Sequence, residues 1–206
     1  MNKRHRCTQC LRPVKTCVCK HIQVVENLVP LIILQHPLEV YEAKNTGRLL
    51  HLCTKNSQIM EGEQFGDRLT ELSESGSFRE ILLYPSEPED ALSRNSLLDT
   101  SAYALAHKPD DSRPFRLWIL DATWRKSRKM LFLNPFLETM PRLSLDDCPA
   151  SQYTIRKAHK KNQLSSLEAS CYALQNLEAN RVDYSPVLSA FAAFVAEQHT
   201  FLPSSQ

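Results

Sequence analysis

Four cysteines near the amino terminus have the spacing of a metal site: Cys7, Cys10, Cys17 and Cys19. Four thiolate sulfurs in so short a segment match the closed tetrahedral site of structural zinc. The cationic residues around them would lower the pKa of the thiols and favour the thiolate form. Because such a short segment cannot build a core, we expect zinc to organise it. An iron–sulfur cluster and free thiols are the alternatives.

The segment Asp121-Ala122-Thr123-Trp124 is the second candidate for chemistry. It follows a strongly apolar run and opens the basic stretch 125–129. An aspartate at the end of a buried strand could act as a general base, provided that it reaches the proton. The alternative is a helix start, with Asp121 or Thr123 as the N-cap of a helix over Trp124–Phe132. The residues alone leave both interpretations open.

The sequence Ser165-Ser166-Leu167-Glu168 fits a capping box, in which Ser165 is the N-cap and Glu168 reaches back to its amide. This reading is structural. A helix amino terminus is nevertheless a good place for the carboxylate of a ligand, because its amides point outward.

Two polar motifs follow the first apolar run of the chain. They are His36-Pro37-Leu38-Glu39 and Lys44-Asn45-Thr46-Gly47-Arg48. Lys44 and Arg48 could hold an RNA phosphate. His36 is a candidate pocket residue, although a single histidine at such a place is more often part of the hydrogen-bonded framework.

Several enzyme classes are disfavoured by what the sequence lacks. Its four glycines form neither G-x-G-x-x-G nor a P-loop, which argues against a dinucleotide-binding Rossmann turn and an NTPase. Neither H-E-x-x-H nor G-x-S-x-G occurs, which argues against a zincin protease and an α/β-hydrolase.

The elements that must position these residues alternate between short apolar strands and helices. We expect strands at 31–35, 81–84 and 116–120, with a short fourth strand at 153–155. We expect helices after Gly47, over Trp124–Phe132, over 167–177 and after Pro186. The polar, proline-bearing stretches 86–95 and 108–114 are predicted loops. The pattern predicts an α/β fold with a mostly parallel sheet and helices on both faces.

Parallel sheets bind ligands beyond the carboxyl ends of their strands. His36-Pro37, Tyr84-Pro85-Ser86, Asp121 and the polar stretch after Ile155 all follow a predicted strand. We therefore expect these strand ends to form one composite pocket.

Bulk properties are those of a globular protein, with 206 residues, 42% hydrophobic and 23% charged. No apolar run approaches the length of a membrane span, and the amino terminus does not read as a secretory signal, so we expect the cytosol. Three stretches (residues 1–25, 125–129 and 156–161) hold fourteen cations. Because the whole chain carries +2, the remainder carries −12. Such segregation favours a basic face for a polyanion, whereas each run alone could be a solvated face.

The ordered set of motifs resembles the DTW-domain family, whose bacterial members are tRNA-uridine aminocarboxypropyltransferases. The resemblance rests on the cysteine module with Arg12-Pro13 inside it, the His36 and Lys44–Arg48 motifs, Asp121-x-Thr123-Trp124 and Ser166-Leu167-Glu168-Ala169. The aspartate, threonine and tryptophan appear here in the spaced form familiar in that family.

The resemblance implies a cysteine module over residues 1–25 and a SPOUT-like domain over 26–206, with a C-terminal knot that binds S-adenosylmethionine. It also implies transfer of the 3-amino-3-carboxypropyl group to N3 of a tRNA uridine, which releases methylthioadenosine. Asp121 then becomes the candidate base or positioning residue. Arg125 would hold the donor carboxylate or an RNA phosphate, and Trp124 would stack on a base or belong to the core.

The remaining site predictions fall into two groups. Expected donor-binding residues are Tyr84, Pro85, Ser86, Thr123, Trp124, Arg125, Ser165, Ser166 and Glu168. Expected RNA-binding residues are Arg12, His36, Lys44, Arg48, Lys126 and Lys157.

Three other functions stay open at this point. The first is an RNA methyltransferase that uses the same donor in another orientation. The second is a non-enzymatic zinc-dependent RNA-binding module, and the third is a zinc-containing α/β protein with no RNA role. The expected partners are tRNA and S-adenosylmethionine, with no membrane, and the oligomeric state stays open between a monomer and a larger assembly.

Overall fold

The computed structural model describes residues 5–85, 112–145 and 164–200. The strands are β1 (Leu31–Gln35), β2 (Ser57–Glu61), β3 (Arg79–Leu83), β4 (Phe115–Asp121) and β5 (Arg142–Leu143). The α-helices are α1 (Gly47–Cys53), α2 (Arg68–Ser73), α4 (Trp124–Leu133), α5 (Pro135–Thr139), α6 (Ser166–Leu177) and α7 (Ser185–Thr200). Three 3-10 turns are η1 (Val14–Thr16), η2 (Cys19–His21) and η3 (Pro37–Glu39).

The five strands form one parallel sheet in the order β2-β1-β4-β3-β5. The predicted strands at 31–35, 81–84 and 116–120 correspond to β1, β3 and β4, within two residues. Sequence reasoning missed β2 and β5. β2 lies at the sheet edge and has only two apolar residues, Ile59 and Met60, between polar ones, and β5 has only two residues.

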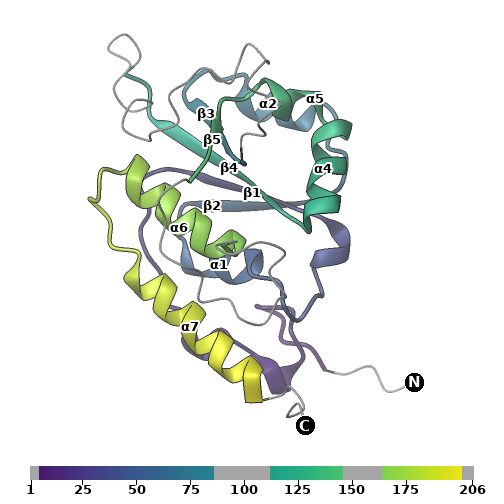
Figure 1. The fold of residues 1–206 in the computed structure, drawn as a ribbon, viewed down its shortest axis with the longest axis vertical. Coiled ribbons are helices and arrows are strands. Elements are labelled where there is room, and N and C mark those ends of the chain that lie inside the picture. Colours follow the sequence, from purple (N-terminus) through teal and green to yellow (C-terminus); the bar gives the residue numbers. More distant parts are fainter. Residues whose placement is uncertain (1–4, 86–111, 146–163, 201–206) are drawn as a thin grey trace.

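Helices cover both faces of the sheet, as the sequence predicts (Figure 1). Alternate residues of β1 point to opposite faces. Leu31 and Ile33 join the core under α1, α6 and α7, whereas Ile32 and Leu34 join the core under α2, α4 and α5. Because both faces of the central strands are buried, their sequences read as continuous apolar runs.

The carboxyl ends of three predicted strands do meet at one edge of the sheet. Gln35 at the end of β1 is in register with Asp121 at the end of β4. Leu83 of β3 is in register with Ile119 of β4, which brings Tyr84 beside the end of β4. The expected contributions of Ser86, Lys157, the strand at 153–155 and the loop at 86–95 lie outside the described residues, as do 108–111 of the second loop.

The chain between β5 and α6 bears on the implied knot. Residues 146–163 make this connection and lie outside the described residues. What the structure establishes is therefore an all-parallel α/β sheet with helices on both faces. None of the described helices is long and apolar enough to cross a membrane.

A buried ion pair joins β3 to β4 at the amino-terminal half of the sheet. The Arg116 guanidinium donates to both carboxylate oxygens of Glu80, at 2.9 and 2.5 Å. The indole N–H of Trp118 donates to the same carboxylate at 2.6 Å. Arg116 and Trp118 are both buried. Since Glu80 accepts hydrogen bonds from two buried side chains, we expect it to stabilise the fold.

Glu80→Ala is expected to lower the free energy of unfolding by about 3–5 kcal/mol, because it removes the counter-ion of a buried guanidinium and the acceptor of a buried indole N–H. Urea unfolding measures this loss. Glu61→Ala, which removes an exposed acid from the edge strand, should change stability by less than about 0.5 kcal/mol. Equal losses in the two variants would contradict this assignment.

Candidate functional site

Asp121 is buried at the last position of β4, with 4% of its surface exposed. Its Oδ2 atom accepts hydrogen bonds from Gln35 Nε2 at 2.7 Å and Asn45 Nδ2 at 2.5 Å. Its own backbone carbonyl accepts from the His36 amide. Two fixed donors on one oxygen hold the carboxylate in a single orientation. The helix-cap interpretation is wrong for Asp121, since it belongs to the strand.

Gly47, the first residue of α1, leaves the room that this carboxylate occupies. A Cβ atom at this position would lie 2.3 Å from Asp121 Oδ2 and 2.4 Å from its Cγ. Those separations are far below van der Waals contact. Only glycine therefore allows α1 to begin directly against the end of β4.

The Asn45 side chain is held as firmly as the carboxylate that it contacts. Its Oδ1 atom accepts from the Arg48 amide at 3.1 Å and from Gln35 Nε2 at 3.2 Å. With the oxygen used in this way, the amide nitrogen faces Asp121. Asn45 is 3% exposed and Gln35 is 3% exposed, so water competes little for these bonds.

An aromatic pair lies next to Asp121, between β3 and the start of α4. The rings of Tyr84 and Trp124 meet edge to face, with centroids 5.7 Å apart. The Tyr84 hydroxyl lies 3.3 Å from Ser127 Oγ, and the Arg142 guanidinium lies over the Tyr84 ring. Trp124 remains 44% exposed although Tyr84 is buried. An exposed indole held by a buried ring can stack on a planar ligand.

His36 and Glu39 contribute to the framework of the same strand end. His36 Nδ1 accepts from the Leu38 amide and Nε2 lies 3.1 Å from a Glu63 oxygen, which fixes the proton on Nε2. The Glu39 carboxylate is 2% exposed and pairs with Lys126 Nζ at 2.8 Å. Lys126, an expected RNA contact, is thus also the counter-ion of a buried acid.

Lys129 and His36 converge on Glu63, which joins the loop after β2 to α4. Lys129 Nζ lies 2.8 Å from the second Glu63 oxygen. Hydrogen bonds from Lys129 and then from His36 hold the pKa of Glu63 below its ordinary value. This carboxylate therefore stays ionised and keeps η3 close to α4.

The predicted capping box at the start of α6 is confirmed. The Ser165 hydroxyl accepts from the Glu168 amide at 3.2 Å, and the Glu168 carboxylate accepts from the Ser165 amide at 2.8 Å. Ser165 and Glu168 are buried and Ser166 is half-buried. Because the two side chains are used inside the box, their expected contact with a donor has less support than the structural role.

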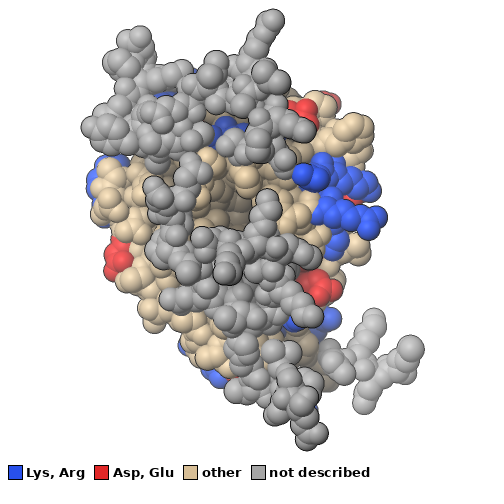
Figure 2. Space-filling view, viewed as in Figure 1, with Lys and Arg blue, Asp and Glu red and all other residues tan. Residues whose placement is uncertain are grey.

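The face shown in Figure 2 is hollowed at its centre. In the same view, Figure 1 places β1 and β4 at the level of this hollow. Thr123, Trp124 and Arg125, at the start of α4, are exposed, as is Pro85 after β3. Figure 2 also shows lysine and arginine side chains gathered over α4, where the sequence places Arg125, Lys126, Arg128 and Lys129.

The four amino-terminal cysteines come together, as their spacing predicts. Their sulfur atoms all lie within 4.8 Å of one another, with Cys7–Cys19 at 3.6 Å and Cys10–Cys17 at 3.7 Å. Four sulfurs placed tetrahedrally about 2.3 Å from a zinc ion would lie about 3.8 Å apart. The cluster therefore fits a tetrahedral metal ion.

The electrostatics of the cluster also suit a cation. Backbone N–H groups of Cys10 and Gln9 lower the pKa of the Cys7 thiol to about 6. Burial, and then hydrogen bonds with the neighbouring thiols, raise the pKa of Cys19. A cation among the four sulfurs would favour its thiolate form.

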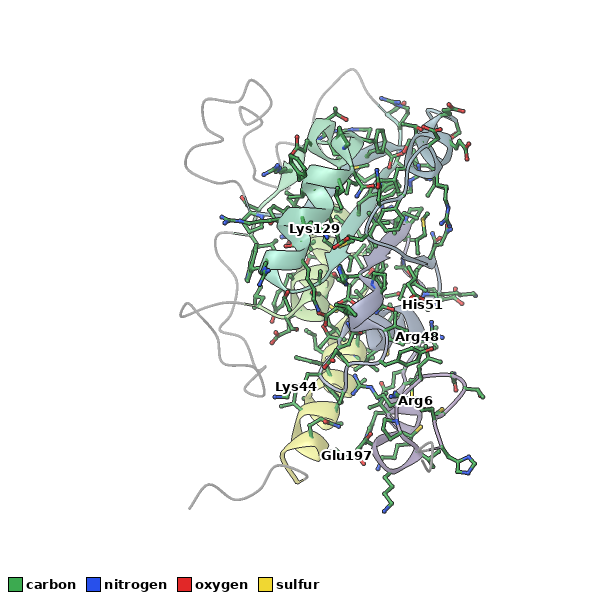
Figure 3. The ribbon with its side chains drawn as sticks, turned by 90° about the vertical axis from the view of Figure 1, so that its right-hand side faces the viewer. Arg6, Lys44, Arg48, His51, Lys129 and Glu197 are labelled. Atoms are coloured by element: carbon green, nitrogen blue, oxygen red, sulfur yellow. The ribbon has the colours of Figure 1, made fainter. Side chains whose placement is uncertain are left out.

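Arg12 and Arg48, both expected to contact RNA, make hydrogen bonds within the protein. The Arg12 guanidinium is 4% exposed and donates to the carbonyls of Ala43 and Asn45. Arg48 donates to the Gln9 carbonyl through Nε at 3.1 Å and Nη2 at 3.0 Å. Lys44 is exposed (Figure 3). Because Arg12 is buried, it is poorly placed to contact a phosphate.

Gln35, Asn45 and Gly47 surround Asp121, although sequence reasoning named none of them as a site residue. Gln35 gave one signal, because it is a polar residue at the end of an otherwise apolar strand. Asn45 and Gly47 lie inside the motif with Lys44 and Arg48, whose positive charges predict contact with an RNA phosphate. Their approach to Asp121 depends on tertiary structure.

Together, the fold and the site define a parallel α/β protein with a buried aspartate at a strand end and a four-cysteine module beside it. A model of the DTW domain matches residues 4–199, nearly the whole chain. The chain therefore belongs to the DTW domain family.

Three relatives carry the same description, tRNA-uridine aminocarboxypropyltransferase 2. The proteins from Macaca fascicularis and Mus musculus are 28% and 27% identical over 205 residues, 95% of this chain and 64% of theirs. The protein from Drosophila melanogaster is 27% identical over 185 residues, 86% of this chain and 68% of its own. The chain thus spans slightly less than two thirds of the first two relatives. No solved structure matches it.

Gly47→Ala is expected to destabilise the protein by about 1–3 kcal/mol, because the new methyl group must displace the Asp121 carboxylate or the start of α1. Denaturant unfolding measures the loss. Gly76→Ala is the matched control. It meets no atom within 4 Å, and its φ of +59° should cost about 1 kcal/mol. A smaller loss at Gly47 than at Gly76 would mean that Asp121 does not need this space.

Proposed function

We propose that this protein transfers the 3-amino-3-carboxypropyl group of S-adenosylmethionine to N3 of a uridine in tRNA. The names of the DTW relatives support a tRNA uridine as the substrate and the aminocarboxypropyl group as the group transferred. The donor and the N3 position are this proposal's own. The observation in the structure that carries the proposal is the buried Asp121 carboxylate, fixed by Gln35 and Asn45 beside an exposed tryptophan.

Asp121 is the proposed general base. Uridine N3 carries a weakly acidic proton, and its anion is the nucleophile that can displace a sulfonium leaving group. Asp121 accepts that proton while N3 bonds to the carbon of the aminocarboxypropyl group that is attached to sulfur. The carbon–sulfur bond breaks with its electron pair on sulfur, and methylthioadenosine leaves. Positioning decides which sulfonium carbon reacts, and it can supply about 7–11 kcal/mol of the barrier.

Other residues take supporting roles in this proposal. Trp124 stacks on the splayed uracil or on the adenine of the donor, and Tyr84 holds the indole in place. Thr123, Pro85 and the start of α6 border the donor. The exposed cations of α4, together with Lys44, contact the tRNA backbone (Figure 2). Arg125 binds either an RNA phosphate or the carboxylate of the donor.

We also propose a domain division and a metal. Residues 1–25 form a zinc module and residues 26–206 form a SPOUT-like transferase domain with a C-terminal knot. Zinc suits the module because its preferred geometry matches the sulfur–sulfur distances, and four cysteine ligands leave no position open for catalysis. The ion is therefore structural.

Asp121→Asn should lower the rate of transfer by about 10²–10⁴-fold, because asparagine keeps the acceptor for Gln35 and Asn45 but takes up no proton. The assay combines purified protein, unmodified tRNA and S-adenosylmethionine, and analyses the nucleosides and the small-molecule product by mass spectrometry. Asp183→Asn, which changes an exposed acid before α7, should react at the wild-type rate.

The products separate the proposal from its alternatives. Methylthioadenosine with aminocarboxypropyluridine supports it, and S-adenosylhomocysteine would identify a methyltransferase. Wild-type protein that binds tRNA but neither binds S-adenosylmethionine nor yields either product would be a non-enzymatic RNA-binding module. A fully active Asp121→Asn variant would remove the base from the mechanism.

Elemental analysis should find about one zinc ion per chain, and Cys7→Ser should lower that occupancy because three sulfurs no longer close the tetrahedron. Cys53→Ser changes a buried cysteine of α1 that is not among the four clustered cysteines and should keep the full complement. Iron in place of zinc, or equal metal content in the two variants, would contradict the proposal.

A further inference from the structure

A buried arginine, Arg12, connects the cysteine segment to the turn before α1. The backbone carbonyl of Arg12 accepts a hydrogen bond from the Cys7 amide at 2.8 Å, so the cysteine turn fixes the position of the Arg12 backbone. Its guanidinium lies over the Phe194 ring of α7, 4.3 Å from the centroid, and donates to the Ala43 and Asn45 carbonyls. One planar fork thus bridges two carbonyls about thirty residues away.

A second arginine joins the two segments in the opposite direction. Arg48 of α1 donates twice to the carbonyl of Gln9, which lies between Cys7 and Cys10. Figure 3 shows Arg48 beside the amino-terminal segment that carries Arg6. The cysteine turn therefore contacts both ends of the short stretch from Asn45 to Arg48.

This stretch also contacts Asp121. Asn45 Nδ2 donates to Asp121 Oδ2, and the Arg48 amide donates to Asn45 Oδ1. Arg12 fixes the Asn45 backbone. The backbone N–H of Arg48 holds the Asn45 side-chain oxygen, and the Arg48 side chain ties this part of α1 to Gln9. A displacement of either arginine would rotate or withdraw the amide that orients the carboxylate.

We propose that Arg12 and Arg48 are positioning residues, through which the cysteine module holds the Asn45 amide on the Asp121 carboxylate. The inference rests on the assignment of Asp121 as the base under the proposed function. It gives the module a task in catalysis beyond the binding of a structural metal ion. It also replaces the expected phosphate contacts of Arg12 and Arg48 with roles inside the protein.

The substitution that tests Arg12 is Arg12→Lys. Lysine keeps the charge but is a single point donor, so it cannot hold two carbonyls in the geometry of the fork. We expect kcat to fall about tenfold or more, while KM for tRNA stays within about twofold. A phosphate contact predicts the opposite, with a raised KM and a weaker salt dependence of tRNA binding.

Lys20→Ala is the matched control. Lys20 also joins the cysteine segment to the rest of the protein, through an ion pair with Glu197 on α7, but that contact does not lead to Asn45. Wild-type kcat in this variant, together with full metal content in both, supports the route through Arg12. An equal fall of kcat in Lys20→Ala would overturn it.

A readout independent of activity is the side-chain amide signal of Asn45 in a nitrogen–proton NMR spectrum. We expect it to shift in Arg12→Lys and in Arg48→Ala, and to stay in place in Lys20→Ala. If Arg12→Lys does not fold, Arg48→Ala, which removes a partly exposed side chain, decides the question by the same measurements.

The two hypotheses fail in different ways. Wild-type protein without transfer activity refutes the proposed function, and the Asn45 signal then tests the coupling alone. Active wild-type protein, with unchanged kcat and an unchanged Asn45 signal in both arginine variants, overturns the positioning role while the proposed function stands.

Discussion

The buried carboxylate of Asp121 is the constraint on which the arrangement of this site depends. A carboxylate that is 4% exposed needs donors that stay in place, since water cannot replace them. Gln35 comes from the neighbouring strand and Asn45 from the turn before α1, and Gly47 gives the space for both elements to approach. The strand register, the turn before α1 and the glycine at position 47 therefore all help to place the two donors on Asp121 Oδ2.

That requirement explains why the amino-terminal module lies where it does. The turn before α1 contains little apolar surface of its own, and it is tied from outside by Arg12 and Arg48. The module in turn contributes Cys10 and Val18 to the core under α7. The amino-terminal segment is thus stabilised by contact with the larger domain.

Aromatic and cationic side chains follow Asp121 along the chain. Trp124 is exposed over the buried Tyr84, and the cations of α4 follow along the same helix. A flat apolar ring next to an ordered anion and a basic surface suits a nucleobase attached to a phosphate chain. The site therefore combines a rigid polar side, built by β1 and the turn before α1, with an accessible side built by β3 and α4.

The sequence by itself determined the features that depend on local pattern. Apolar runs marked β1, β3 and β4 because both of their faces are buried. The serine and glutamate spacing marked the capping box of α6, and the cysteine spacing marked the cluster of four sulfurs. Tertiary structure decided the partners of each charge. Arg12 reads as a surface cation until its burial is known, and Asn45 becomes a partner of Asp121 only because parallel strands bring residues 76 positions apart into contact.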